Sequence, residues 1–216
     1  MIRCPRIAAV LGVSFAMVFF CPPASAVVVH LRVDPGATQI VASVNEPIAR
    51  IRGAASGTFT VITGKIEGDP ANPAANGRVE IVIDATSYSS GSAHRDKVVM
   101  RDALEAPRFP VVTFVSTRIE DLKWEVQGVD ATATVVGNLT LHGVTREVRV
   151  RIDATLSPDR HLSADGDLRF DFTDFGVKPP STLFGALKTG TVVDLNFRVI
   201  AVPADQFVPA PTPTPQ

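Results

Sequence analysis

The sequence predicts an all-β protein of about eight antiparallel strands, with a short helix that covers one end of the fold. Several segments alternate apolar and polar residues with a period of two, which gives each strand one buried and one solvated face. Glycine- and proline-rich turns such as Gly68–Gly77 separate these segments. One charged segment with helical spacing interrupts them. Strands spaced in this way form a barrel or a sandwich, and alternation alone does not choose between the two.

The first 26 residues have the layout of a secretory signal peptide. Two arginines precede the apolar run Ile7–Phe20, and Ala24–Ala26 supplies the small residues of a cleavage site. The run is shorter than the ~20 residues that a membrane-spanning helix needs. Both cysteines, Cys4 and Cys21, lie in this segment. The exported chain is therefore expected to be held together by its core without disulfides.

The strands follow in order along the rest of the chain. The four segments with the cleanest alternation are Val79–Asp84, Val148–Asp153, Leu168–Phe172 and Val193–Val199. Weaker candidates lie around His30, Ile40, Phe59, Phe114 and Val135. Together they make eight or nine strands, which is typical of antiparallel sheets with one face in the core.

The helical segment runs from about His94 to Leu104. Met100 and Leu104 stand four residues apart, as neighbours on one helix face do. Ser92 is a suitable N-cap, and Pro107 and Pro110 end the helix before the next strand begins. A helix at this place either seals the core or forms a rim over a cavity, and the sequence leaves both alternatives open.

Charge and composition limit the partners. Without the signal segment the chain has 19 basic and 22 acidic residues, a net charge of −3, and no clustered basic face. No nucleic-acid partner is therefore expected. The last fifteen residues contain five prolines, which sustain neither helix nor strand, so residues 203–216 are predicted to be a disordered tail. The folded domain is expected to occupy residues 27–202.

No motif predicts catalysis, a metal or another cofactor. The nucleophile-elbow pattern G-x-S-x-G is absent. The histidines show no metal-ligand spacing with cysteines or carboxylates; they are His30, His94, His142 and His161. His142 precedes Gly143 and fits a tight hairpin turn. The sequence therefore favours a binding protein over an enzyme.

Three motifs in order resemble those of the YceI-like family. The segment Thr86–Glu120 has a serine-rich turn, an Arg-Asp pair, a short helix and a P-x-x-x-F strand entry. The segment Val135–Ile152 contains G-x-L-T-x-x-G-x-T, and Phe170–Pro180 supplies the third match. The matching residues are Arg95, Asp96, Pro110, Phe114, Gly137, Leu139, Thr140, Gly143, Thr145, Phe175 and Gly176. The resemblance covers roughly Val27–Val202.

This resemblance implies an extended, lipocalin-like antiparallel β-barrel with an apolar, tunnel-like interior. It also implies an exported bacterial protein, periplasmic or secreted, that binds a polyisoprenoid, an isoprenoid quinone or a related long-chain lipid. The chain has twelve Phe but a single Tyr and a single Trp. Because a phenyl ring has no polar group to satisfy, this balance suits a dry interior.

The inward-facing apolar residues are the candidate ligand-binding set, although the same residues would also suit a filled core. The set comprises Phe59, Phe114, Leu139, Val150, Phe170, Phe172, Leu195 and Phe197. Arg95 and His142 are the headgroup candidates, since a guanidinium fork suits phosphate. The pair of Arg95 and Asp96 has an alternative role as a structural ion pair or cap that fixes the helix to the barrel.

The sequence thus predicts a protein that carries or stores a long-chain amphiphile without catalysis. Two alternatives remain: an enzyme or enzyme accessory that acts on isoprenoid amphiphiles, and a filled barrel that functions through its surface in envelope stress. The sequence also leaves open whether the barrel is a monomer or a homodimer.

Overall fold

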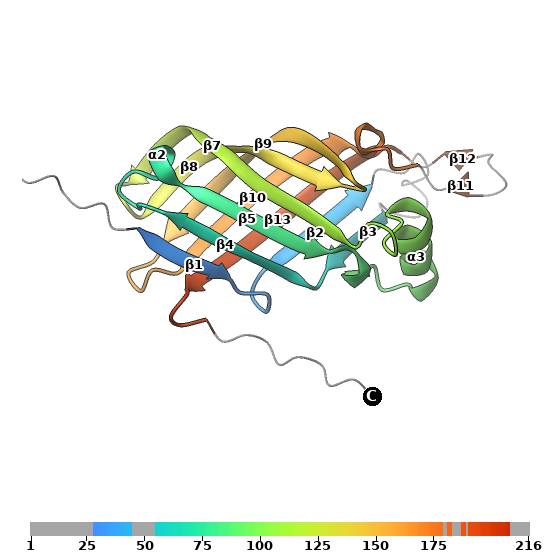
Figure 1. Ribbon diagram of the computed structural model, residues 1–216, viewed down its shortest axis with the longest axis horizontal. Helices are drawn as coiled ribbons and strands as arrows, with labels where there is room; N and C mark the ends of the chain where they lie inside the picture. The colour runs from blue at the N-terminus through green and yellow to red at the C-terminus, as the bar shows by residue number, and fades with distance from the viewer. Residues whose placement is uncertain (1–27, 45–54, 179–180, 183–186, 189, 208–216) are drawn as a thin grey trace, which may run out of the picture.

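A computed structural model of the chain describes residues 28–44, 55–178, 181–182, 187–188 and 190–207 (Figure 1). The predicted signal segment lies outside these residues, and so does the part of the proline-rich tail from residue 208 onward. The predicted limits of the signal segment, domain and tail therefore stay predictions. Within the described part of the chain, no helix has both the length and the hydropathy needed to cross a bilayer.

Thirteen strands and five short helical elements make up the described chain. The strands are β1 (Val29–Val33), β2 (Gln39–Val44), β3 (Ala55–Phe59), β4 (Ile62–Gly68), β5 (Arg78–Asp84), β6 (Tyr88–Ser89), β7 (Val111–Val126), β8 (Asp130–Leu141), β9 (Val144–Leu156), β10 (Leu162–Asp171), β11 (Ser181–Thr182), β12 (Leu187–Lys188) and β13 (Val192–Pro203). The helical elements are α2 (Pro73–Asn76), α3 (Ala93–Val98), the π-helical turn η2 (Val99–Ala103) and the 3₁₀ turns η1 (Ala85–Ser87) and η3 (Phe172–Phe175).

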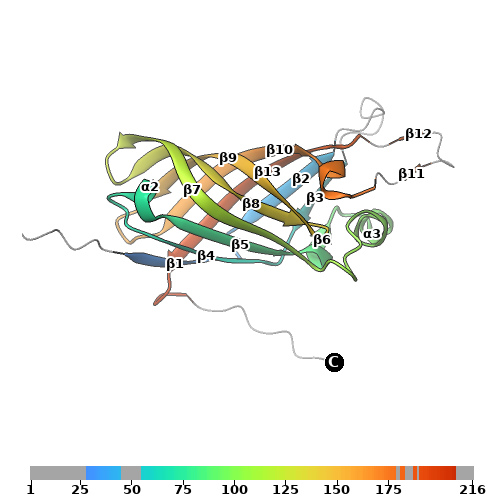
Figure 2. The same cartoon turned by 45° about the horizontal axis from the view of Figure 1, so that its top comes forward.

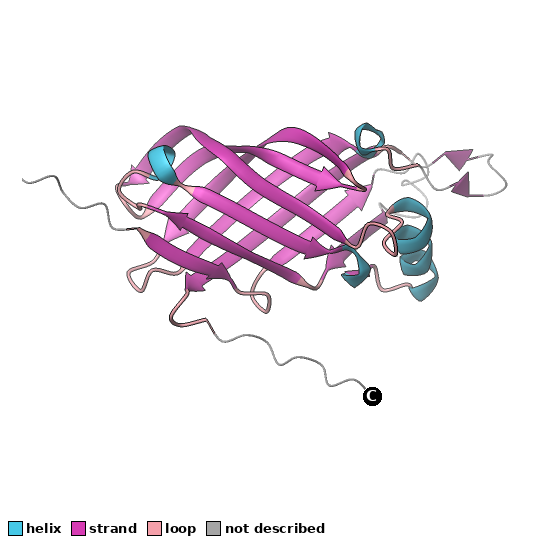
Figure 3. Ribbon diagram, in the orientation of Figure 1, coloured by secondary structure: helices cyan, strands magenta, loops and turns pink. Residues whose placement is uncertain are grey.

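The strands close into an eight-stranded antiparallel barrel, which confirms the predicted fold class (Figures 1 and 3). β1 and β2 pair with successive parts of β13, and β4 and β3 pair with β1 and β2 in turn. β1 and β2 together occupy one strand position of the ring, and β4 and β3 together occupy the next. The remaining positions are β5, β7, β8, β9, β10 and β13, and the pairing of β1 with β13 completes the ring. Each strand position thus has a paired neighbour on both sides, although β9 and β10 pair only over Arg151–Leu156 and Leu162–Asp167.

Alternation along the strands places the apolar side chains inside. On β8, the residues Ala131, Ala133, Val135, Leu139 and Leu141 are all buried, whereas most of their neighbours are more exposed. A register shift in the pairing of β7 with β8 breaks the alternation between Ser116 and Arg118. Such a bulge bends the strand and lets long strands follow the curve of the barrel.

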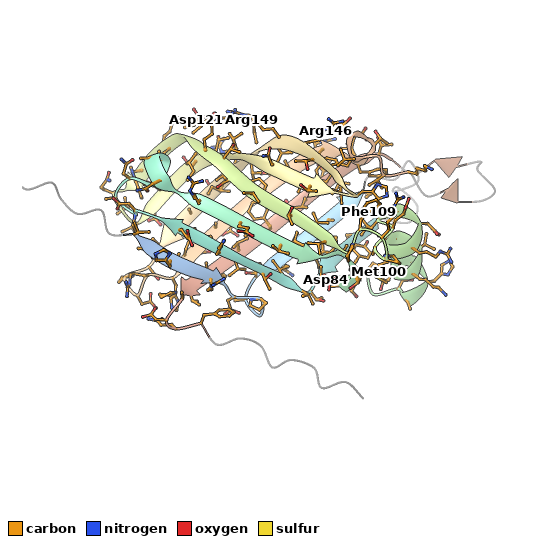
Figure 4. The ribbon with its side chains drawn as sticks, in the orientation of Figure 1. Asp84, Met100, Phe109, Asp121, Arg146 and Arg149 are labelled. Carbon is orange, nitrogen blue, oxygen red and sulfur yellow. The ribbon has the colours of Figure 1, made fainter. Side chains whose placement is uncertain are left out.

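The outer face of β7 and β9 carries a network of ion pairs. Arg118 contacts both Glu120 and Glu147, and Arg149 contacts Glu120. Figure 4 shows Arg149 on the outside of the barrel beside Asp121. The charged residues therefore lie on the solvated face, as the alternating pattern predicts.

The predicted helix lies at one end of the barrel as two elements, α3 and η2 (Figure 2). Ser92 occupies the N-cap position, but its hydroxyl makes no capping hydrogen bond. The helix ends earlier than a regular helix over His94–Leu104 would, because the backbone widens into a π-helical turn at Val99. The opposite end of the barrel carries α2 (Figure 1). The two ends are therefore covered by different segments.

Candidate ligand-binding tunnel

A cavity of about 930 Å³ occupies the interior of the barrel. This volume is at the upper end of the range of ~300–1,000 Å³ that is usual for ligand pockets. The lining extends from the α2 end, at Pro73, to the α3 end, at Val98. Between the ends the wall is made of apolar side chains from every strand of the barrel ring. We call this cavity the tunnel.

The structure places all eight apolar residues of the predicted set in the tunnel wall. Their positions span β3, β7, β8, β9, β10, η3 and β13. They are Phe59, Phe114, Leu139, Val150, Phe170, Phe172, Leu195 and Phe197. Of the two headgroup candidates, Arg95 lines the tunnel and His142 is not among the lining residues.

Glycines in the wall explain how a barrel with so many phenyl rings stays hollow. A Cβ atom added at Gly137 would lie 2.6 Å from the ring of Phe114, and one added at Gly166 would lie 2.6 Å from the ring of Phe197. Each ring therefore lies over a glycine on the neighbouring strand, along the wall instead of across the lumen. A glycine inside a strand often marks such a close approach.

A third ring is held in the same way at the α3 end. A Cβ at Gly57 would lie 2.3 Å from the ring of Tyr88, which covers this glycine from β6. Phe59 packs against Tyr88 edge to face, with 5.5 Å between ring centroids. Both aromatic residues line the tunnel. Burial raises the pKa of the Tyr88 hydroxyl, and the nearby positive charge of Arg95 opposes this shift.

Arg95 and Asp96 do not pair with each other. The Asp96 carboxylate accepts hydrogen bonds from the backbone N–H of Ser90, at 2.8 Å, and from the Ser90 hydroxyl, which ties α3 to the chain that follows β6. Arg95 has no salt-bridge partner among the described residues. Asp96 thus anchors the helix, and the Arg95 guanidinium is left at the tunnel end.

The α2 end of the tunnel has a different character. Its charged lining residues are Glu67, Asp69 and Arg78, which come from the end of β4, the following loop and the start of β5. Trp124 on β7 lines the same end. The imidazole of His30 lies 3.5 Å from the Glu67 carboxylate, on the outer side of this rim.

His142 lies in the hairpin between β8 and β9, outside the tunnel lining. His142 and Gly143 both have positive φ, 53° and 75°, as a two-residue hairpin between β8 and β9 requires. The imidazole packs against Phe109, with 4.4 Å between ring centroids, and its Nε2 lies 3.2 Å from Glu105 without hydrogen-bond geometry. Figure 4 shows Phe109 and Met100 at the α3 end. His142 therefore joins the hairpin to the chain that follows η2.

The turn η3 completes the wall beside the α3 end. Asp171 accepts hydrogen bonds from the backbone N–H of Thr173 at 2.9 Å and from the hydroxyls of Thr173 and Thr191 at 2.6 and 2.7 Å. These bonds fix the turn that presents Phe172 to the tunnel. They also lower the pKa of the Asp171 carboxyl, chiefly through the Thr173 hydroxyl.

Replacing Asp171 with Asn is expected to lower stability at neutral pH and to have a smaller effect in acid. A carboxyl whose folded-state pKa is lowered stabilises the fold above its unfolded pKa of ~3.9, and this contribution disappears as the pH falls through the folded value. The difference in unfolding free energy between wild type and variant should narrow over that window. Urea unfolding at a series of pH values measures it, and a constant difference would contradict the assignment.

Sequence reasoning did not single out Tyr88, Trp124 or the glycines as parts of the tunnel. The only Tyr and only Trp of the chain stand at opposite ends of it. The signal for Gly137 and Gly166 was their position inside alternating strands, where a residue without a side chain weakens the strand unless another group fills the space. Within the described residues, no group of three or more His, Cys, Asp or Glu side chains is arranged to hold a metal ion.

Comparison with known proteins relates the chain to one family. Residues 31–201 match the model of the YceI-like domain. A UPF0312 protein of Vibrio vulnificus is 30% identical over 149 residues, which are 66% of this chain and 71% of the relative. A UPF0312 protein of Pseudomonas putida is 29% identical over 154 residues, which are 68% of this chain and 72% of the relative.

Solved structures share the fold. The crystal structure of Burkholderia cenocepacia BcnA superposes with a TM-score of 0.66 at 22% identity, covering 79% of this chain and 99% of BcnA. A polyisoprenoid binding domain from Saccharophagus degradans, implicated in plant cell wall breakdown, superposes with a TM-score of 0.58 at 16% identity and covers 82% and 99% of the two chains. At these identities the likeness shows the barrel fold.

Proposed function

The chain belongs to the YceI-like domain family, and from this premise we propose that it is an exported protein that holds one long-chain isoprenoid amphiphile in its tunnel, for transport or storage and without catalysis. The observation that carries the proposal is the continuous apolar cavity of about 930 Å³ between the two barrel ends. The polyisoprenoid-binding activity of the Saccharophagus degradans domain, which has the same fold, supports the ligand class. The layout of the first 26 residues supports export.

The driving force is the transfer of the hydrocarbon chain from water to the tunnel. Each buried CH₂ contributes roughly 0.8 kcal/mol. A chain with ten buried carbons therefore gains on the order of 8 kcal/mol before the cost of immobilisation is subtracted. The wall needs no polar groups for this purpose, which agrees with the apolar lining between its ends.

The arrangement of polar groups supports binding over catalysis. The ionisable residues in the lining lie at the two ends of the tunnel and not along its middle. A general base and a nucleophile must lie within hydrogen-bond reach of each other and of the reacting atoms. The cavity also argues against the alternative of a filled barrel, since about 930 Å³ is far more than a packed core leaves empty.

The first experiment is native mass spectrometry of the exported protein, followed by solvent extraction of the bound material. The proposal predicts a stoichiometric long-chain species with isoprenoid fragmentation. A bare protein mass that does not change after incubation with isoprenoid quinones and polyprenyl phosphates would contradict the proposal. Analysis of the extracted species also identifies its head group.

Replacing Arg95 with Met is expected to weaken the binding of polyprenyl phosphate by about 10- to 100-fold, because a hydrogen bond to a charged group contributes ~1.5–3 kcal/mol. Binding of the uncharged polyprenol should change little. The matched control is Lys97→Met, which removes a positive charge from the same helix at a position outside the tunnel lining. Titration by isothermal calorimetry compares the three proteins, and equal losses in both variants would rule out Arg95 as the headgroup site.

A further inference from the structure

The two ends of the tunnel differ in charge, and from this difference we infer that the tunnel binds an anionic amphiphile in one direction. The anionic head lies at the α3 end beside Arg95, and the end of the hydrocarbon chain lies beside Trp124 at the α2 end. The inference rests on the proposed function and adds the orientation of the ligand and the sign of its head group.

The α3 end attracts an anion. Arg95 and His94 are its titratable lining residues besides Tyr88, and no Asp or Glu of the described chain lines this end. The nearest carboxylate in sequence, Asp96, accepts its hydrogen bonds from Ser90 and forms no ion pair with Arg95, and at Tyr88 the effect of the Arg95 charge is larger than that of Asp96. The Tyr88 hydroxyl adds a hydrogen-bond donor of the kind that a phosphate or carboxylate accepts.

The α2 end disfavours an anion. Its charged lining residues are two acidic ones, Glu67 and Asp69, and one basic one, Arg78, and the Glu67 carboxylate lies on the outer side of the rim, 3.5 Å from the imidazole of His30. Arg78 lies directly across from Glu67 in the pairing of β4 with β5, so the two side chains lie on the same face of the sheet. An anionic head at this end would meet like charge, whereas an apolar chain end would meet Trp124 and Val129.

The tunnel is long enough to separate the two ends of a bound chain. On β8 the inward-facing residues run from Ala131, which pairs with Trp124, to Leu141 at the α3 end. Ten residue steps at ~3.4 Å give about 34 Å along the strand, which is about 26 Å along the barrel axis at a tilt of ~40°. A label at the head and a label at the chain end would therefore lie far apart.

Trp124 is the single tryptophan of the chain and reports which end of the ligand lies beside it. The probes are two long-chain carboxylic acids, one brominated next to the carboxyl group and the other at its terminal carbons, since bromine quenches tryptophan fluorescence on contact. The expected result is loss of most of the Trp124 emission with the terminally brominated acid and almost none with the acid brominated near its head.

A matched variant moves the reporter to the other end. In the double variant Trp124→Phe with His94→Trp, the only tryptophan stands at an exposed lining position of the α3 end. The quenching pattern of the two acids should then be reversed. Circular dichroism confirms that the barrel is intact in the variant before the comparison is made.

The possible outcomes distinguish a failure of the proposed orientation from a failure of the proposed function. Strong quenching of Trp124 by the head-brominated acid alone, or equal quenching by both acids, would overturn the orientation while the tunnel still binds lipid. Absence of quenching with the acid bound in native mass spectrometry would also overturn it, because the chain end would not reach Trp124. Absence of both quenching and bound acid, together with a bare protein mass after incubation with polyprenyl phosphates and isoprenoid quinones, would overturn the proposed function itself.

Discussion

Replacing Ala133 with Trp is expected to abolish lipid binding while the barrel stays folded. Ala133 is buried on β8, lines the tunnel one inward-facing position from Ala131 toward the middle, and pairs with Ile152 of β9. An indole ring at this position enters a space that is empty in the structure, so it blocks the lumen with less of the ~1–3 kcal/mol cost that overpacking has in a filled core. Native mass spectrometry of the purified variant should show the bare protein mass.

The matched control for this variant is Thr132→Trp. Thr132 precedes Ala133 on the same strand and is not among the lining residues, so its side chain points away from the tunnel. This variant should retain its lipid, and thermal melting followed by circular dichroism should show both proteins folded. Stoichiometric lipid in the Ala133→Trp variant would mean that the ligand lies outside the tunnel.

Most of the fold could be predicted from the sequence, because the alternation of apolar and polar residues with a period of two shows directly which face of each strand is buried. The segment Val79–Asp84 is almost the whole of β5, and Val193–Val199 lies inside β13. The helix between two strands was predicted at the correct place from its spacing and the prolines that follow. The π-helical turn was not predicted, because its wider backbone does not change the pattern of apolar residues in the sequence.

The character of the interior could not be predicted from the alternating pattern alone. A strand with one apolar face fits a filled core and a hollow tunnel equally well. The difference arises where a ring meets a glycine across strands, as Phe114 meets Gly137, because only the pairing register brings the two together. The register depends on three shifts in the pairing of β7 with β8, between Ser116 and Arg118, Glu120 and Lys123, and Trp124 and Val126, which no local pattern marks. Contacts of this kind are properties of the closed barrel.

The surroundings of the charged residues at the tunnel ends could not be predicted from the sequence either. The adjacent residues Arg95 and Asp96 were open to interpretation as an ion pair, but the structure gives Asp96 a different partner in Ser90 and leaves Arg95 at the lumen. The acidic residues Glu67 and Asp69 come from the end of β4 and the loop after it, which the sequence shows only as a boundary between strands. Its relation to Trp124 depends on strands that are distant in sequence and adjacent in the barrel.

Replacing Phe175 with Ala is expected to lower the free energy of unfolding by about 3–5 kcal/mol, the usual cost of removing a buried phenyl ring. Phe175 is only 1% exposed and packs edge to face on Phe170, with 5.3 Å between ring centroids. It is not among the tunnel-lining residues, so its removal leaves a new void instead of widening the tunnel. Gly176 ends the turn in a left-handed conformation with φ of 73°, which glycine adopts without strain.

Phe172→Ala is the comparison that separates stability from binding. Phe172 lies in the same turn but borders the tunnel, so one face of its ring already lacks packing partners and its removal should cost less stability than that of Phe175. Urea unfolding followed by Trp124 fluorescence measures both variants, and calorimetric titration with polyprenyl phosphate measures binding. Phe172→Ala should weaken binding more than Phe175→Ala does. If Phe172→Ala instead changes stability alone, the ring belongs to a packed core and the ligand does not reach η3.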